Sequence, residues 1–272
     1  MSKMKPFSWL TLNILVLGFV SFLTDVSSEM VFSLLPFFMT SVLGIGIPLV
    51  GLIEGAAEAT ASLLKVFSGW FSDKFKKRKV FAVFGYSIST MLKPLFAFAT
   101  STPHIFAIRI FERVGKGIRT SPRDALISDS VRAEVRGKAY GLHRSMDTLG
   151  AVIGPLIAFF LFPLFGYRKV FLLSVIPAVT AVVLLIMLVK EKKPTRGVSK
   201  VPPLWSGFGS LSREFKIFVV IATIFTLSRF SYAFFLLRAA SLGVAEEHAP
   251  LLYILFNVVY AIFAFPAGNT RR

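Results

Sequence analysis

The sequence is divided into apolar stretches, each long enough to cross a lipid bilayer as a helix. Stretches of at least about 18 mainly apolar residues indicate membrane-spanning helices. These stretches are continuous and lack the period-two alternation of membrane strands, so we expect helices and no barrel. The sequence therefore predicts an all-α membrane protein, with eight spans at residues 12–38, 47–71, 80–100, 104–128, 139–163, 167–190, 214–238 and 249–268.

Composition agrees with a membrane protein and argues against other classes. Hydrophobic residues make up 55% of the chain and charged residues only 17%, whereas soluble domains average about 45–50% and about 25%. The net charge of +17 does not indicate a nucleic-acid partner, because most basic residues flank apolar runs. There is no cysteine, and we expect neither a cofactor nor a metal, since the three histidines show no ligand spacing: His104, His143 and His248.

Sequence motifs of enzymes are missing from the chain. The segment VGKGIRT (114–120) contains a Gly-Lys pair, but Ile110 and Gly117 occupy positions where a phosphate-binding loop needs Gly and Ser or Thr. No nucleophile elbow, zinc-binding helix or dinucleotide turn appears. We therefore do not expect an enzyme.

The loops between the expected spans differ in charge, which predicts the orientation of the chain. KFKKRK (74–79), the basic segment 132–138 and KEKKPTRGVSK (190–200) fall on one side, and the loops on the other side carry few Lys or Arg. The positive-inside rule places the basic loops and the N-terminus in the cytoplasm, in a plasma (inner) membrane protein. The longest polar connection, 191–212, is expected to be a cytoplasmic linker between a six-helix bundle (1–190) and a two-helix part of a second half (213–272).

Several spans carry charged residues near their middle. A mid-span Asp, Lys or Arg costs about 2.5–3.5 kcal/mol on insertion, and a Leu or Phe returns only about 0.3–0.6 kcal/mol. On a helical projection these charges fall on one side of each helix, within arcs of about 80° (12–38), about 40° (47–71) and about 140° (104–128). We interpret them as the lining of a substrate or proton cavity, formed by Asp25, Glu29, Glu54, Glu58, Arg109, Glu112, Arg113, Arg144 and Asp147.

An alternative interpretation is that these charges only pair with one another and hold the helices together. Residues near helix ends could also reach the membrane interface with their long side chains; these are Lys65, Arg119 and Arg123. Helices in lipid associate through small residues alone, however, so a polar cavity explains the stripes better. Asp25 and Glu29 would then be carboxylates able to carry protons.

The segment SGWFSDKFKKRK resembles the cytoplasmic motif G-x-x-x-D-R-x-G-R-R of the major facilitator superfamily. It lies between the second and third spans, where that family has its motif. Lys76 stands where the family usually has Gly, which predicts a less tight turn. The matching residues imply a gate motif at the cytoplasmic side, made of Gly69, Asp73, Lys74, Lys77 and Arg78.

Two further segments are similar to motifs of the same family. RIFERVGKG resembles its Arg-and-Gly motif in the fourth span, which implies a cavity arginine at Arg109 or Arg113. DTLGAVIGP resembles its Gly-Pro motif in the fifth span, with Gly150, Gly154 and Pro155. Asp147 lies on the face of these glycines, within about 60°, so we expect close helix packing there and a kink at the proline.

The resemblance covers the whole chain and implies a permease with a major facilitator superfamily helix bundle, comprising the N-terminal six-helix half and the first two helices of the second half. Such transporters move a small solute across the bilayer by alternating access. Intramembrane basic residues slightly outnumber acidic ones, which favours an organic anion, with protons as the coupling ion.

The chain also looks truncated after the eighth span, because twelve spans at this spacing would need roughly 400 residues. The alternative function is therefore a fragment that inserts into the membrane, or only binds a partner, without transporting.

Overall fold

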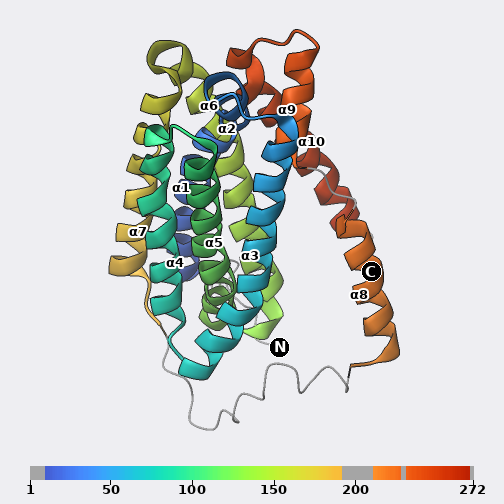
Figure 1. Cartoon of the computed structure of the whole chain (residues 1–272). Coiled ribbons are helices and arrows are strands. Elements are labelled where there is room, and N and C mark those ends of the chain that lie inside the picture. Colours follow the sequence, from blue (N-terminus) through green and yellow to red (C-terminus); the bar gives the residue numbers. More distant parts are fainter. Residues whose placement is uncertain (1–9, 192–210, 228–230, 270–272) are drawn as a thin grey trace.

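The computed structural model describes residues 10–191, 211–227 and 231–269, and these ranges contain helices and no strand (Figure 1). The all-α prediction is therefore confirmed. Short π- and 3₁₀-helical segments, labelled η, join some of the helices. In chain order the elements are α1 Leu12–Phe32, α2 Leu35–Phe37, η1 Phe38–Val42, α3 Ile47–Phe75, α4 Arg78–Leu92, η2 Lys93–Phe98, α5 Thr102–Ser130, η3 Ala133–Val135, α6 Arg136–Leu173, α7 Val175–Leu188, α8 Arg213–Leu227, α9 Tyr232–Ser241, η4 Glu246–His248 and α10 Ala249–Asn269.

Four helical stretches of the described residues are long and apolar enough to cross a membrane: Leu12–Val42, Ile47–Phe75, Arg78–Phe98 and Ala133–Leu188. The last of these has 56 residues and contains both α6 and α7. Helix α5 has 29 residues, a length of about 44 Å, but it carries the most charged side chains of any expected span. Neighbouring helices must therefore shield the charged side chains of α5 from lipid.

The break expected between the fifth and sixth spans is present, and the boundaries of the seventh span differ from the prediction. The label α6 covers two helices that meet at a kink at Gly166 (φ 67°, ψ 179°), a backbone conformation open to glycine. The seventh span, predicted over 214–238, contains α8 and α9, and α9 begins after Ser231, whose hydroxyl accepts a hydrogen bond from the Ala233 N–H. Residues 228–230 between them, and 192–210 of the expected linker, lie outside the described residues.

The loops meet at two opposite ends of the bundle, as the alternating spans predict. At one end the Asn13 side chain donates to the Lys190 carbonyl at 2.6 Å, and the Arg78 N–H donates to Glu191. This end holds the basic loops, and we call it the basic end. At the opposite end Ser41 and Tyr167 both donate to the Glu246 carboxylate.

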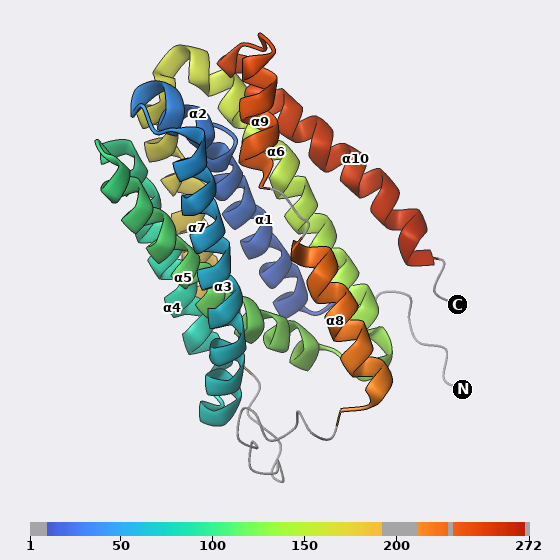
Figure 2. The same ribbon diagram turned by 45° about the vertical axis from the view of Figure 1, so that its right-hand side comes forward.

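Helix α1 lies inside the bundle and packs against α6 and α7, while α5 packs between α3 and α4. Aromatic side chains fill the core near the opposite end, where the Phe38 and Phe171 rings lie 5.3 Å apart. Helices α9 and α10 lie beside that end of α6 in both views (Figures 1 and 2). There Phe37 packs with Leu236 and Tyr253, so the two C-terminal helices are joined to the first six.

The turn after α3 corrects one expectation. Lys76 ends α3 in the left-handed conformation (φ 53°, ψ 37°), and its N–H donates to the Ser72 carbonyl. This is the helix termination that glycine usually provides. The prediction that a lysine here loosens the turn was wrong, because the lysine adopts the glycine-like backbone.

Candidate functional site

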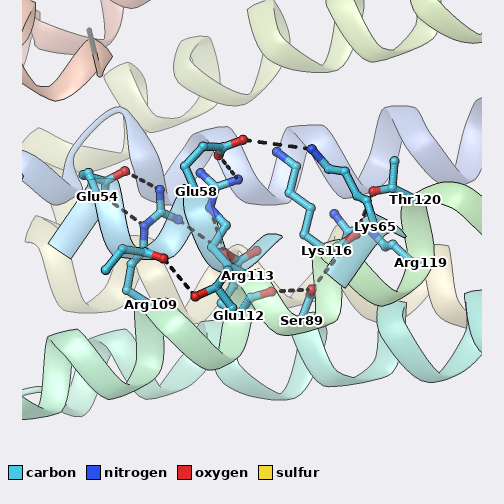
Figure 3. Close-up of polar contacts among 12 residues, drawn as sticks. Glu54, Glu58, Lys65, Ser89, Arg109, Glu112, Arg113, Lys116, Arg119 and Thr120 are labelled. Carbon is cyan, nitrogen blue, oxygen red and sulfur yellow. Dashed lines mark hydrogen bonds and ion pairs between the residues drawn. The ribbon is translucent and has the colours of Figure 1, made fainter. Parts of the chain in front are cut away.

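The charged residues of α3 and α5 face one another across the helix pair. Residues three and four apart on α5 share a face, which turns Arg109, Glu112, Arg113, Lys116 and Arg119 toward α3 and α4. Figure 3 shows these side chains with Glu54, Glu58 and Lys65 of α3. The stripes predicted on the second and fourth spans thus lie against each other.

Arg109 and Glu54 form a closed pair. The Arg109 Nε and Nη2 donate to the two Glu54 oxygens at 2.8 and 2.7 Å, a bidentate arrangement. Their side chains are only 3% and 13% exposed. The guanidinium also contacts Glu112 at 3.3 Å and lies 3.9 Å from the centre of the Phe32 ring. These contacts use most of the donors of Arg109, so it is less available to a ligand.

Arg113, one turn along α5, is held more loosely. Its Nη1 lies 3.6 Å from Glu58 and its Nε 3.7 Å from Glu112. Both nitrogens are buried and have no hydrogen-bond partner among the described residues. Glu58 is 59% exposed and also lies 4.0 Å from Lys65, and Lys116 extends beside it (Figure 3). On this part of the face Glu58 is exposed and the two lysines are partly exposed. Arg113 contributes N–H groups that lack a hydrogen-bond acceptor among the described residues.

The three residues near helix ends differ in their surroundings. Arg119 is buried, donates to the Ser89 hydroxyl at 2.8 Å and lies over the Tyr86 ring. The alternative that it extends to the membrane interface was therefore wrong. Arg123 is partly buried and pairs with Asp124 at 2.8 Å, and the Lys65 side chain is 34% exposed.

A second polar strip runs between α1 and α6. A Cβ on Gly150 would lie 2.6 Å from the Phe22 carbonyl, and one on Gly154 would lie 2.6 Å from the Val26 carbonyl, so the helices touch along their backbones. Asp147, on the same face, accepts a hydrogen bond from Ser21. The non-helical residue in α6 is Gly166, not the buried Pro155, so no break marks the proline.

Asp25 and Glu29 of α1 are partly buried beside these glycines. The Glu29 Oε2 is buried and has no hydrogen-bond partner among the described residues, and the Tyr253 hydroxyl from α10 faces the carboxyl group. Arg144 lies at the edge, 66% exposed and 3.9 Å from Asp147. The candidate cavity residues therefore form two groups, one on α3 and α5 and one on α1 and α6.

The expected gate motif lies at the basic end. Arg78 pairs with Asp73 at 2.8 Å and with Asp129 at the end of α5, and its backbone N–H donates to Glu191 after α7. The motif thereby ties together the ends of α3, α4, α5 and α7. Of its other members, a Cβ on Gly69 would lie 3.2 Å from Ser121, Lys74 lies over the Trp70 ring, and Lys77 directly precedes α4.

The sequence did not indicate the roles of several residues. Lys93 is fully buried and donates to the Ser27 hydroxyl at 2.8 Å and the Thr24 carbonyl at 3.3 Å. It stands alone in its apolar stretch, so no stripe marked it. Gly115 and Gly117 bring α4 and α3 against α5, although the sequence attributed close packing only to the fifth span. No cluster of metal-binding side chains occurs in the part of the chain that the structure describes.

A bundle of long apolar helices that encloses charged side chains is typical of a multi-pass membrane protein. The family model described as Major Facilitator Superfamily matches residues 17–271. The chain belongs to the Major Facilitator Superfamily, a family of transporters and not of enzymes.

Known relatives agree with this assignment. An uncharacterised MFS-type transporter of Methanocaldococcus jannaschii is 40% identical over 267 residues, which cover 95% of this chain but only 66% of the relative. A bacterial homologue of the human lysosomal transporter Spinster, in an inward-facing and unoccupied conformation, superposes with a TM-score of 0.71 at 19% identity, over 97% of this chain and 62% of that one. A D-xylose–proton symporter superposes with a TM-score of 0.70 at 16% identity, over 97% and 69%. These two structures show the fold.

Proposed function

We propose that the protein moves a small anionic solute across the membrane by alternating access, together with protons. The observation that carries this proposal is the pair of buried Arg113 nitrogens that make no hydrogen bond within the described residues, although Glu58 and Glu112 lie 3.6 and 3.7 Å away. Buried guanidinium donors are normally satisfied, and their geometry fits a carboxylate or phosphate. Lys65 and Lys116 stand beside them on the open part of the α3–α5 face. A bound anion would complete these contacts.

The charge balance of the interior supports proton coupling. Six acidic residues line the two polar strips: Asp25, Glu29, Glu54, Glu58, Glu112 and Asp147. Seven basic residues lie beside them: Lys65, Lys93, Arg109, Arg113, Lys116, Arg119 and Arg144. Protonation of a carboxyl group on α1 would make the two strips more positive and favour an anion. Proton and anion would therefore bind together, as in symport.

The same proposal includes an orientation and a division of the chain. We place the basic end and the N-terminus in the cytoplasm of a plasma (inner) membrane protein, since Lys and Arg loops favour that side. We also propose that residues 1–190 form one six-helix half and residues 213–272 belong to the second half. Alternating access then consists of motion between these parts around the charged faces.

Anion binding to the purified chain in nanodiscs tests the proposal without requiring a complete transport cycle. Radiolabelled benzoate, succinate and inorganic phosphate would be measured by scintillation proximity. We expect one of them to bind and Arg113→Gln to weaken it by about tenfold or more, since a hydrogen bond to a charged group contributes about 1.5–3 kcal/mol. Arg213→Gln, in the exposed first turn of α8, is the matched control and should leave binding unchanged.

Failure of all three anions to bind would count against an anionic substrate. Equal losses in the Arg113→Gln and Arg213→Gln variants would mean that net charge, and not the α3–α5 face, governs binding. Uptake of the bound anion into liposomes, driven by an imposed pH gradient, tests the transport step itself.

A further inference from the structure

Polar side chains form a row along the contact between α1 and α6, and we call this row the ladder. On α1, Ser21, Asp25 and Glu29 follow one another at intervals of four residues, about 6 Å along the helix. On α6, Asp147 bonds Ser21, and the next two turns place glycines against Asp25 and Glu29. The two helices are in backbone contact there, so the carboxyl groups of Asp147, Asp25 and Glu29 follow one another along the helix contact.

His143 extends this ladder by one turn toward the basic end. It is 5% exposed, and its Nδ1 lies 3.6 Å from the Asp147 carboxylate. Its Nε2 is also buried and has no hydrogen-bond partner among the described residues. A buried imidazole nitrogen of this kind normally has a partner. The geometry leaves it free to accept or donate a proton.

Charged groups of α5 and α6 face the imidazole, and one carboxyl group of α1 acts on its partner Asp147. Arg123 and Asp124 face it from α5, and Arg144 and Asp147 face it from its own helix. From α1, Asp25 acts on Asp147 and is itself close to Lys116 and Arg119 of α5. Positive and negative neighbours are thus mixed around the imidazole.

We propose that His143 and Asp147 form a proton-binding pair that connects the basic end with Asp25 and Glu29. The proposal rests on the proton-coupled function proposed above. The Nε2 takes up a proton, and the imidazolium gives its Nδ1 proton to the Asp147 carboxylate, which leaves a neutral imidazole and a neutral carboxyl group. Asp147 then passes the proton to Asp25, one turn further along the ladder.

This assignment separates the proton from the substrate within the bundle. The anion binds at the open α3–α5 face around Arg113, and the proton moves between α1 and α6. Asp25 lies between the two strips, since it faces both Asp147 and Lys116. A proton bound on the ladder therefore changes the electrostatic potential at the anion site, although no residue binds both the proton and the anion.

Infrared difference spectroscopy tests the pair without a substrate. Spectra of the purified protein in nanodiscs would be compared between about pH 8 and pH 3.5, a range that extends below the ordinary titration of histidine. We expect an imidazole band and the C=O band of a protonated carboxyl group to change together. His143→Gln and Asp147→Asn should each alter both bands. The control His104→Gln, whose Nδ1 lies 3.2 Å from the Thr100 hydroxyl, should remove its own imidazole signal and leave the carboxyl band. A carboxyl band that is unchanged in His143→Gln would overturn the proposal.

A second measurement uses the binding of benzoate, succinate and phosphate across the same pH range. Wild type is expected to bind its anion with an affinity that changes about tenfold with pH, and His143→Gln is expected to bind with a nearly constant affinity. Loss of binding in Arg113→Gln alone identifies the anion site. The same pH profile in wild type and His143→Gln contradicts the proton pair. Absence of anion binding in wild type counts against the proposed function, and the infrared result still decides the pair.

Discussion

Lys76 has a backbone conformation that is unfavourable for a residue with a side chain. It holds the left-handed conformation that ends α3, and that conformation costs a residue with a side chain about 1–2 kcal/mol. We therefore expect Lys76→Gly to stabilise the folded protein by about 1 kcal/mol, measured as a higher midpoint of thermal unfolding in detergent.

The neighbouring Lys77 provides the matched control. It has an ordinary negative φ of −127°, so Lys77→Gly should leave the midpoint unchanged or lower it. Both changes remove one positive charge from the same loop. Stabilisation by both variants would point to charge repulsion and contradict the backbone explanation.

Two glutamates on α3 differ sharply in burial, which gives a second prediction. Glu54 pairs with the buried Arg109, and Glu54→Gln should destabilise the protein by about 3 kcal/mol, because loss of one partner leaves a buried charge. Glu58 is 59% exposed, so Glu58→Gln should cost less than about 1 kcal/mol. Denaturant unfolding of the two variants would measure this difference, and equal costs would show that the Arg109 pair is not buried in the membrane protein.

The sequence predicted the charged faces of individual helices but not their partners. Helical periodicity places Glu54 and Arg109 on the inner faces of two spans, yet no pattern says that they meet bidentately. The roles of Lys93 and His143 were also missed: Lys93 stands alone in its apolar stretch, and His143 was considered only as a metal ligand. Which side chains pair depends on how the helices rotate and shift against each other. The pattern of a single sequence does not show this.

The glycines of α6 differ in how closely a neighbouring helix approaches them. A Cβ on Gly154 would lie 2.6 Å from the Val26 carbonyl of α1, whereas a Cβ on Gly141 would meet nothing within 4 Å. We expect Gly154→Ala to force the two helices apart and lower the unfolding midpoint. Gly141→Ala should raise it, since alanine is favoured over glycine in a helix by about 1 kcal/mol. Destabilisation of equal size in both variants would contradict the close contact between α1 and α6.

Helix existence was predictable, and some boundaries were not. Apolar stretches of span length gave the positions of the helices, and even α5 was found despite its charges. The break between the fifth and sixth spans was predicted, and the structure places it at the single residue Gly166. The break between α8 and α9 inside the seventh span was not predicted, because the apolar stretch 214–238 gives no sign of it.

At the scale of the molecule, Glu246 joins the C-terminal helices to the first six at the end opposite the basic loops. Its carboxylate accepts hydrogen bonds from Ser41 of η1 and Tyr167 of α6. Glu246→Ala should open this end, because hydrogen bonds to a charged group contribute about 1.5–3 kcal/mol each. Spin labels on cysteines introduced at the exposed Val42 and Leu242 would report a longer distance.

Glu247→Ala is the matched control for this experiment. Glu247 is the neighbouring residue, its side chain is 53% exposed, and its carboxylate lies 3.9 Å from the His248 ring. It should leave the distance distribution as in wild type. An unchanged distribution in Glu246→Ala would mean that apolar packing alone holds this end together.

The orientation of the whole chain can be tested with single cysteines, because the natural sequence has none. A cysteine at Lys77 should react in intact cells only with membrane-permeant reagents, and one at Glu247 also with impermeant ones. The reverse pattern would place the basic end outside and contradict the proposed orientation.

The contact between Ser21 and Asp147 joins residues 126 positions apart. Ribosomes add about 5–20 residues per second, so α1 is synthesised roughly 6–25 s before the helix that covers its carboxylates. During that interval Asp25 and Glu29 have no α6 to shield them from lipid. The first helix must therefore wait inside or beside the insertion machinery, and biogenesis of this chain depends on a delayed release of its first span.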